Sequence, residues 1–109
     1  MKSIKDIKEL LEGIEGYEDK VTYWQWKVGE APPLPFICFF ANSTNEFAAD
    51  NENYSSFNVY SVEFYSEHKD PTQEALIESA LKNNNLFYRK ESVFLSDENV
   101  WETIYTVEG

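Results

Sequence analysis

Residues 36–41 read FICFFA, a run in which every side chain is apolar. Successive side chains of a β-strand point to opposite faces of a sheet, so a strand of this composition is stable only where both faces are covered. Elements of the same chain can cover both faces. Alternatively, the chain's own helices cover one face and a partner chain covers the other. This requirement limits the folds that the rest of the chain can adopt.

Two segments carry helix signals, residues 4–13 and 71–82. In the first, apolar side chains recur three and four residues apart behind a capping pattern that begins at Ser3. In the second, Asp70 is suited to the N-cap and Pro71 to the first helical position. The residues of the second helix that we expect to face inward are Leu76, Ile77, Ala80 and Leu81.

Five segments predict strands, namely residues 21–28, 36–41, 57–66, 86–95 and 100–107. A Pro-rich connector (29–35), a long polar loop (42–55) and a tight turn (96–99) separate them. The order is helix, three strands, helix, two strands, and short connections favour antiparallel neighbours. We therefore expect a single domain over residues 1–109, of the α+β class. Its antiparallel or mixed sheet would have about five strands, with both helices on one face.

The charge pattern argues against phosphate-bearing partners. The formal net charge is -11, and residues 28–68 contain six acidic residues and no Lys or Arg. Nucleic-acid binding and attachment to anionic membranes both require basic patches, so we expect neither. No segment is apolar for long enough to be a signal peptide or a membrane span, and we expect a cytoplasmic protein.

Catalytic and metal-binding motifs are not evident in the sequence. The single His68 lies in a polar turn that we expect to be exposed, which favours a structural role. The single Cys38 lies in the apolar run without a basic neighbour, which favours packing in the core. Asp50 and Glu52 could belong to a calcium loop, but the central Gly and the distant Glu of such a loop are missing. We expect no enzymatic activity, no cofactor and no metal.

Aromatic side chains are numerous for a core of this size. They could line a ligand pocket, although core packing is the favoured interpretation for Tyr23, Trp24, Trp26, Phe36, Phe39, Phe40 and Tyr60. Glu63 interrupts an apolar strand between Val62 and Phe64. From the residues alone, it is an exposed strand carboxylate.

Several stretches resemble a family of small proteins from tailed bacteriophages and prophages of Gram-positive hosts, encoded among the head-tail joining and tail genes. The most specific are GEAPPLPF, FAADN and EFYSEHKDP, and the likeness extends over residues 20–107. These proteins are similar to tail terminators or tail-completion proteins. The resemblance implies a ring, usually a hexamer, that caps the tail tube and offers a surface to the head connector.

The resemblance also implies where the chain works and which residues make contacts. We expect assembly in the host cytoplasm, a place in the virion tail, and a subunit that is monomeric when isolated. The expected interaction residues are Asn45, Glu46, Phe47, Asp50, Asn51, Glu52 and Glu63. In a ring, Glu63 would be an interface or strand-end group, and the sharper alternative is a buried pair with a Lys or Arg of a neighbouring subunit. The alternatives are another head-tail joining or minor capsid component and, from a different class, an acidic inhibitor or DNA mimic.

Overall fold

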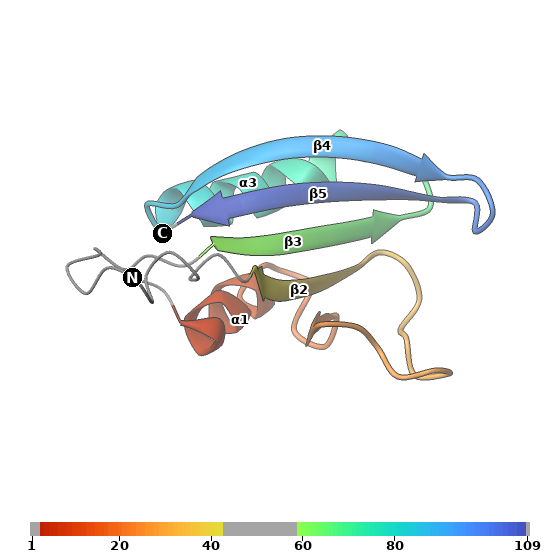
Figure 1. Ribbon diagram of the computed structural model, residues 1–109, viewed down its shortest axis with the longest axis horizontal. Coiled ribbons are helices and arrows are strands. Elements are labelled where there is room, and N and C mark those ends of the chain that lie inside the picture. Colours follow the sequence, from red (N-terminus) through yellow and green to blue (C-terminus); the bar gives the residue numbers. More distant parts are fainter. Residues whose placement is uncertain (1–2, 43–58, 109) are drawn as a thin grey trace, which may run out of the picture.

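The computed structural model describes residues 3–42 and 59–108, which form one five-stranded sheet and two helices (Figure 1). The strands lie in the order β1-β2-β3-β5-β4; β1 is parallel to β2, and the other neighbours are antiparallel. The elements are α1 (Ile4–Glu12), β1 (Val21–Tyr23), β2 (Phe36–Asn42), β3 (Val59–Ser66), α3 (Pro71–Asn83), β4 (Phe87–Leu95) and β5 (Val100–Glu108). The expected α+β class is confirmed.

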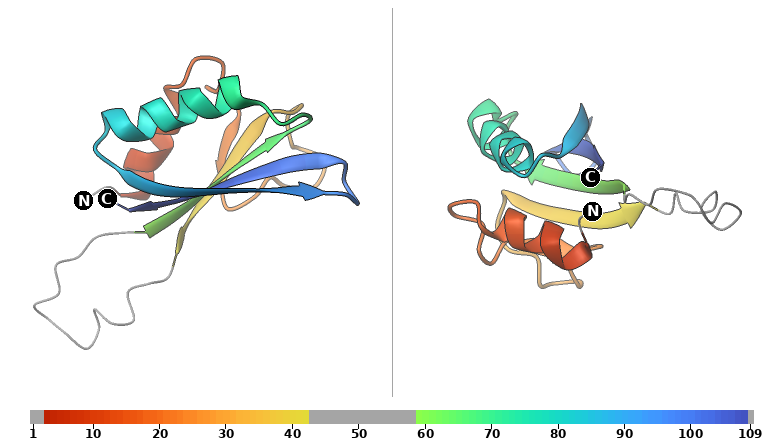
Figure 2. Two further views of the ribbon diagram at one scale, coloured as in Figure 1. Left: turned by 90° about the horizontal axis from the view of Figure 1, so that it is seen from above. Right: turned by 90° about the vertical axis from the view of Figure 1, so that its left-hand side faces the viewer.

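Both helices lie on the same side of the sheet (Figure 2). Their apolar faces pack against alternate residues of the strands, and the register brings Phe39, Val62 and Tyr105 side by side on three neighbouring strands. The core cluster consists of Ile7, Leu11, Ile14, Tyr17, Val21, Ile37, Phe39, Tyr60, Val62, Phe64, Ile77, Leu81, Leu86, Tyr105 and Val107. One face of the sheet is therefore covered in the way that the sequence predicts.

Side-chain caps begin both helices. The Ser3 hydroxyl accepts a hydrogen bond from the Asp6 backbone N–H at 3.2 Å, and the Asp6 carboxylate accepts one from the Ser3 backbone N–H at 2.9 Å. At α3 the Asp70 carboxylate accepts from the backbone N–H of Gln73 at 3.2 Å, and Pro71 follows the cap. These bonds satisfy backbone donors that have no partner within the helix, so the capping signals in the sequence are confirmed.

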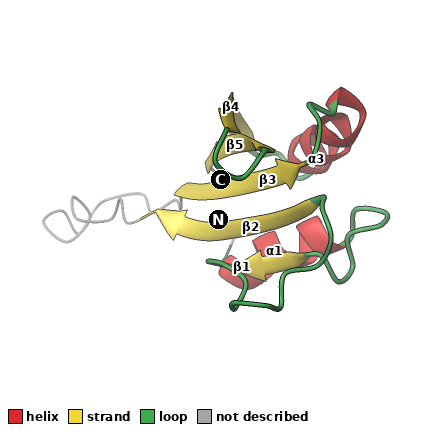
Figure 3. Ribbon diagram, turned by 90° about the vertical axis from the view of Figure 1, so that its right-hand side faces the viewer, coloured by secondary structure: helices red, strands yellow, loops and turns green. Residues whose placement is uncertain are grey.

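The first strand differs from the expectation of a strand over residues 21–28. It ends at Tyr23, because Trp24 adopts a φ of 75°, and the chain leaves the sheet there (Figure 3). Residues 24–35 then return the chain to the end of the sheet where β1 began, which makes β1 and β2 parallel. The other boundaries agree to within one residue where the structure describes them. Residues 43–55 of the expected loop and 57–58 of the expected third strand lie outside the described part of the chain.

The buried face of α3 also differs in one position from the expectation. Leu76 is 39% exposed, whereas Glu74, Ile77 and Leu81 are buried and lie three and four residues apart. That spacing defines one face of a helix, and Leu76 lies beside it. The expectation for Leu76 relied on its apolar side chain. The inward position is taken instead by Glu74, whose carboxylate has partners inside the fold.

Adjacent positions on α3 test this assignment. We expect Ile77→Ala to lower the free energy of unfolding by about 2–5 kcal/mol, because it removes a fully buried side chain and leaves a cavity. Leu76→Ala is the matched control, for which we expect a loss of less than about 1 kcal/mol. Urea unfolding followed by circular dichroism measures both. Equal losses would contradict the assigned face.

Candidate functional site

The sheet face opposite the helices, called the open face here, is only partly covered by the residues that the structure describes. The strand register places Phe36, Cys38 and Phe40 of β2 on it, while Ile37 and Phe39 point into the core. Residues 24–35 cover this part of the face. The Trp24 ring lies 5.1 Å from the Phe40 ring, and the Trp26 ring lies 6.1 Å from the Phe36 ring, measured between centroids. The apolar run is thus covered on both faces by its own chain.

A pocket of about 400 Å³ lies between this covering segment and the sheet. Its aromatic lining residues are Trp24, Trp26, Phe36, Phe40 and Tyr65, and its polar ones include Cys38, Glu63 and Glu98. Four of the seven aromatic residues considered in the sequence therefore line a pocket, whereas Phe39 and Tyr60 pack in the core. Tyr23 lies at the sheet edge, and its ring contacts that of Phe39 at 5.2 Å.

Two carboxylates share one hydroxyl beside this pocket. The Tyr65 hydroxyl oxygen lies 3.1 Å from Glu63 Oε1 and 3.0 Å from Glu102 Oε2. The register explains the meeting, because Glu102 is paired with Tyr65 and lies diagonally across from Glu63 on the neighbouring strand. A tyrosine hydroxyl has one proton to donate, so it satisfies only one of the two carboxylates at a time.

The same surroundings shift the pKa values of nearby groups. Burial, followed by the charge of Glu102, raises the pKa of Glu63 even though the Tyr65 hydroxyl bond acts in the opposite direction. Burial, followed by the charge of Glu63, raises the pKa of the Cys38 thiol to about 11. At neutral pH Cys38 is therefore a protonated, poorly nucleophilic thiol, which agrees with a packing role.

Trp26 contributes a further polar group. Its indole Nε1 is buried and has no hydrogen-bond partner among the described residues. A buried donor without an acceptor costs about 1–3 kcal/mol, and native structures contain few of them. Trp26 lines the same pocket as Glu63, so the pocket region has a donor without an acceptor as well as an excess of negative charge.

Of the interaction residues expected from the sequence, only Glu63 falls in the described part of the chain. Asn45, Glu46, Phe47, Asp50, Asn51 and Glu52 lie outside it, as does the calcium-loop pattern. His68 is exposed, and its Nε2 lies 3.7 Å from the carboxylate of Glu67. No group of three or more His, Cys, Asp or Glu side chains in residues 3–42 and 59–108 is placed to hold a metal ion.

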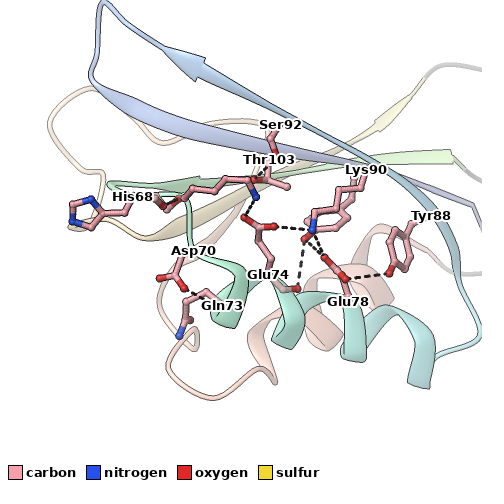
Figure 4. Close-up of polar contacts among 12 residues, drawn as sticks. His68, Asp70, Gln73, Glu74, Glu78, Tyr88, Lys90, Ser92 and Thr103 are labelled. Carbon is pink, nitrogen blue, oxygen red and sulfur yellow. Dashed lines mark hydrogen bonds and ion pairs between the residues drawn. The ribbon is translucent and has the colours of Figure 1, made fainter.

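A second polar cluster joins α3 to β4 on the helix side of the sheet (Figure 4). Glu74 is 1% exposed, and its two carboxylate oxygens lie 2.5 Å from Lys69 Nζ and 2.7 Å from Lys90 Nζ. Lys90 Nζ also lies 2.7 Å from Glu78, which accepts a hydrogen bond from the Tyr105 hydroxyl at 2.9 Å. The cluster thus pairs its buried charges within the fold.

The pKa shifts in this cluster follow from that pairing. Burial raises the pKa of Glu74, but hydrogen bonds from Lys69 and Lys90 together outweigh it and hold the pKa below its usual value. The pKa of Glu78 is likewise held below its usual value, because hydrogen bonds from Lys90 and Tyr105 outweigh the effect of burial. Because each carboxylate has a cation beside it, this cluster has a structural role and offers no free group to a ligand.

Sequence reasoning identified Glu63 but missed its neighbours. Tyr65 and Glu102 could have been found, since strand residues two apart share a face and Glu102 is an acid in an otherwise apolar and Thr-rich strand. Pairing β5 with β3, however, depends on the tertiary fold. Glu74 could have been found from its spacing to Ile77 and Leu81.

Comparisons of the chain with models of protein families, with curated proteins and with solved structures found no match. Within residues 3–42 and 59–108, neither helix has the length and apolar character needed to cross a bilayer. The candidate site is therefore defined by its own geometry, as an aromatic pocket with an unneutralised pair of carboxylates.

Replacing Glu63 tests the electrostatics of the pocket. A folded-state pKa above the unfolded value means that ionisation of Glu63 opposes folding as pH rises through that folded pKa. We expect Glu63→Gln to raise the melting temperature of dilute protein at pH 7, with the gain disappearing below about pH 4, where the carboxyl is protonated in both states. The exposed Glu67→Gln is the control. A loss of stability at pH 7 would contradict this account.

The paired cluster has the opposite pH dependence. We expect Glu74→Gln to lower the free energy of unfolding at pH 7 by about 1–3 kcal/mol, because hydrogen bonds between charged groups are lost. The lowered pKa of Glu74 means that its contribution is lost as pH falls through the folded-state pKa, so the deficit should shrink in acid. Urea unfolding at pH 7 and pH 3 measures this. A deficit independent of pH would contradict it.

Proposed function

We propose that this protein is a structural assembly protein, a bacteriophage or prophage tail terminator whose ring caps the tail tube and joins it to the head connector. The proposal combines the sequence resemblance with a fold that leaves large surfaces for contacts between subunits. It assigns no enzymatic role. Of the two residues considered for catalysis in the sequence, Cys38 is a protonated thiol and His68 is exposed beside Glu67.

The observation that carries the proposal is that strand β4 lies at the edge of the sheet with exposed apolar side chains. It is a nine-residue edge strand, and among the described strands only β5 lies beside it. Phe87 is 79% exposed, and Val93 and Phe94 are each 42% exposed. Long edge strands with exposed apolar side chains pair readily with other chains, and monomeric proteins usually shield them. A subunit that joins a ring would use such an edge strand to contact the next subunit.

The charge of the chain supports the same function. A net charge of -11 disfavours tight binding of DNA, as expected for a protein that surrounds a channel through which DNA passes. The partners proposed are other copies of the chain, in a hexameric ring, together with the tail tube protein and the head connector protein. The isolated subunit would be monomeric at low concentration, because copies that each carry a net charge of -11 repel one another.

Deleting the gene from its phage tests the function. A tube end stays open to further subunits until a ring of a different protein occupies it. We therefore expect filled heads beside unjoined tails that are often longer than normal. Electron microscopy of lysates measures tail length and attachment, and a plasmid-borne copy of the gene is the control for loss of this protein alone.

Other outcomes separate the alternatives. Tails of normal length attached to heads would eliminate the terminator. Tails of normal length without heads would favour another head-tail joining component. An acidic inhibitor or DNA mimic predicts normal virions throughout, since such a protein has no place in the particle.

A further inference from the structure

The pocket on the open face lacks positive charge. Glu63 and Glu102 share one tyrosine proton, and Glu98 adds a third carboxylate to the same region. None of these three acids forms an ion pair with a Lys, Arg or His of the described residues. By contrast, the buried Glu74 has two lysines. A cation in the pocket would satisfy carboxylates that the chain itself does not neutralise.

The aromatic lining favours an organic cation over a metal ion. Trp24, Trp26, Phe36 and Phe40 surround the space, and the faces of aromatic rings attract organic cations, above all the flat guanidinium group of arginine. A guanidinium also donates two parallel hydrogen bonds to a carboxylate. A small hydrated metal ion makes no use of such walls, and the described residues offer it no set of three ligands.

An arginine side chain matches both features of the lining. Its flat face fits against the aromatic rings, and its parallel donors fit the carboxylates. The pocket is therefore suited to an arginine on a protein segment.

We propose that the pocket binds Arg89 of a second copy of this chain. Arg89 is the only arginine in the sequence and the only basic residue that the described strands place on the open face. It is exposed and forms no ion pair among the described residues, not even with Glu91 two positions along the same strand.

Arg89 of the same chain does not serve this role. Strand β5 separates β4 from β3, which places Arg89 and Glu63 two strand spacings apart, about 10 Å across the sheet, and on different cross-strand rows. The cation and its pocket therefore lie on different parts of one face. That arrangement allows Arg89 of each subunit to enter the pocket of the next and brings the apolar edge of β4 into the contact.

A double-mutant cycle on self-association tests this contact. The variants are Arg89→Ala, Glu63→Gln and the two combined, and sedimentation velocity over a concentration series gives each association constant. We expect each single change to weaken association at least about tenfold, and the combined change to weaken it no more than the stronger single one. Arg89→Lys should recover part of the loss, because it keeps the charge without the planar fork.

The controls separate the contact from folding. Glu67→Gln, in the turn after β3, and Lys82→Ala, on the helix side, should leave association unchanged. Circular dichroism confirms the fold of each variant. Glu63→Gln is informative because it is expected to stabilise the subunit while weakening association, and damage to the fold would not produce this combination.

Two results would overturn the inference: additive effects of the two changes, or a wild-type chain that stays monomeric at every concentration up to its solubility limit. The inference rests on the self-association that the proposed function requires, but the two can fail separately. A closed dimer dependent on Arg89 and Glu63 would keep the inference and count against the ring. Over-long tails in the deletion phage, with rings unaffected by either change, would keep the terminator and reject this contact.

Discussion

Strand β2, an inner strand of the sheet, must be covered on both faces, and the rest of the structure follows from that need. Its inner side chains, Ile37 and Phe39, pack under two helices. Two short helices cannot also reach the other face of a five-stranded sheet. The chain solves this by ending β1 at Tyr23 and turning sharply at Trp24, so that residues 24–35 fold over Phe36 and Phe40. The same turn creates the pocket, because a loop covers a flat sheet less completely than a helix does.

The two acidic clusters of the fold, around Glu74 and around Glu63, differ in whether the chain itself supplies cations that neutralise them. Glu74 is the more deeply buried, yet Lys69 and Lys90 neutralise it, and it ties α3 to the sheet. Glu63 is only partly buried, yet its nearest charged neighbour is another carboxylate, Glu102. A buried charge with partners needs nothing from outside the chain, whereas a like-charged pair is stabilised by a proton or by a cation from another molecule.

The sequence predicted most of the architecture because its signals are local. Helix caps at Ser3 and Asp70 and the alternation in β3 and β5 depend on neighbouring residues alone. The exposure of Leu76 was missed, and the sequence left open which strands of a mixed sheet would be parallel, since the pairing of β1 depends on distant parts of the chain. At the site, Glu63 was identifiable as an acid in an apolar strand. Its meeting with Glu102, and the pocket beneath the connector, required the strand order β3-β5 and the turn at Trp24.

The distribution of tryptophans gives the molecule an internal optical probe. Of its three indoles, Trp24 and Trp26 both line the pocket, while the Trp101 ring contacts the Phe94 ring near the β4–β5 turn, with 5.3 Å between centroids and the planes tilted by 55°. Intrinsic emission therefore arises largely from the open face. The wavelength of this emission depends on whether water contacts the indoles of that surface. The native chain therefore reports by fluorescence, without an added label, whether the open face is in contact with water or with protein.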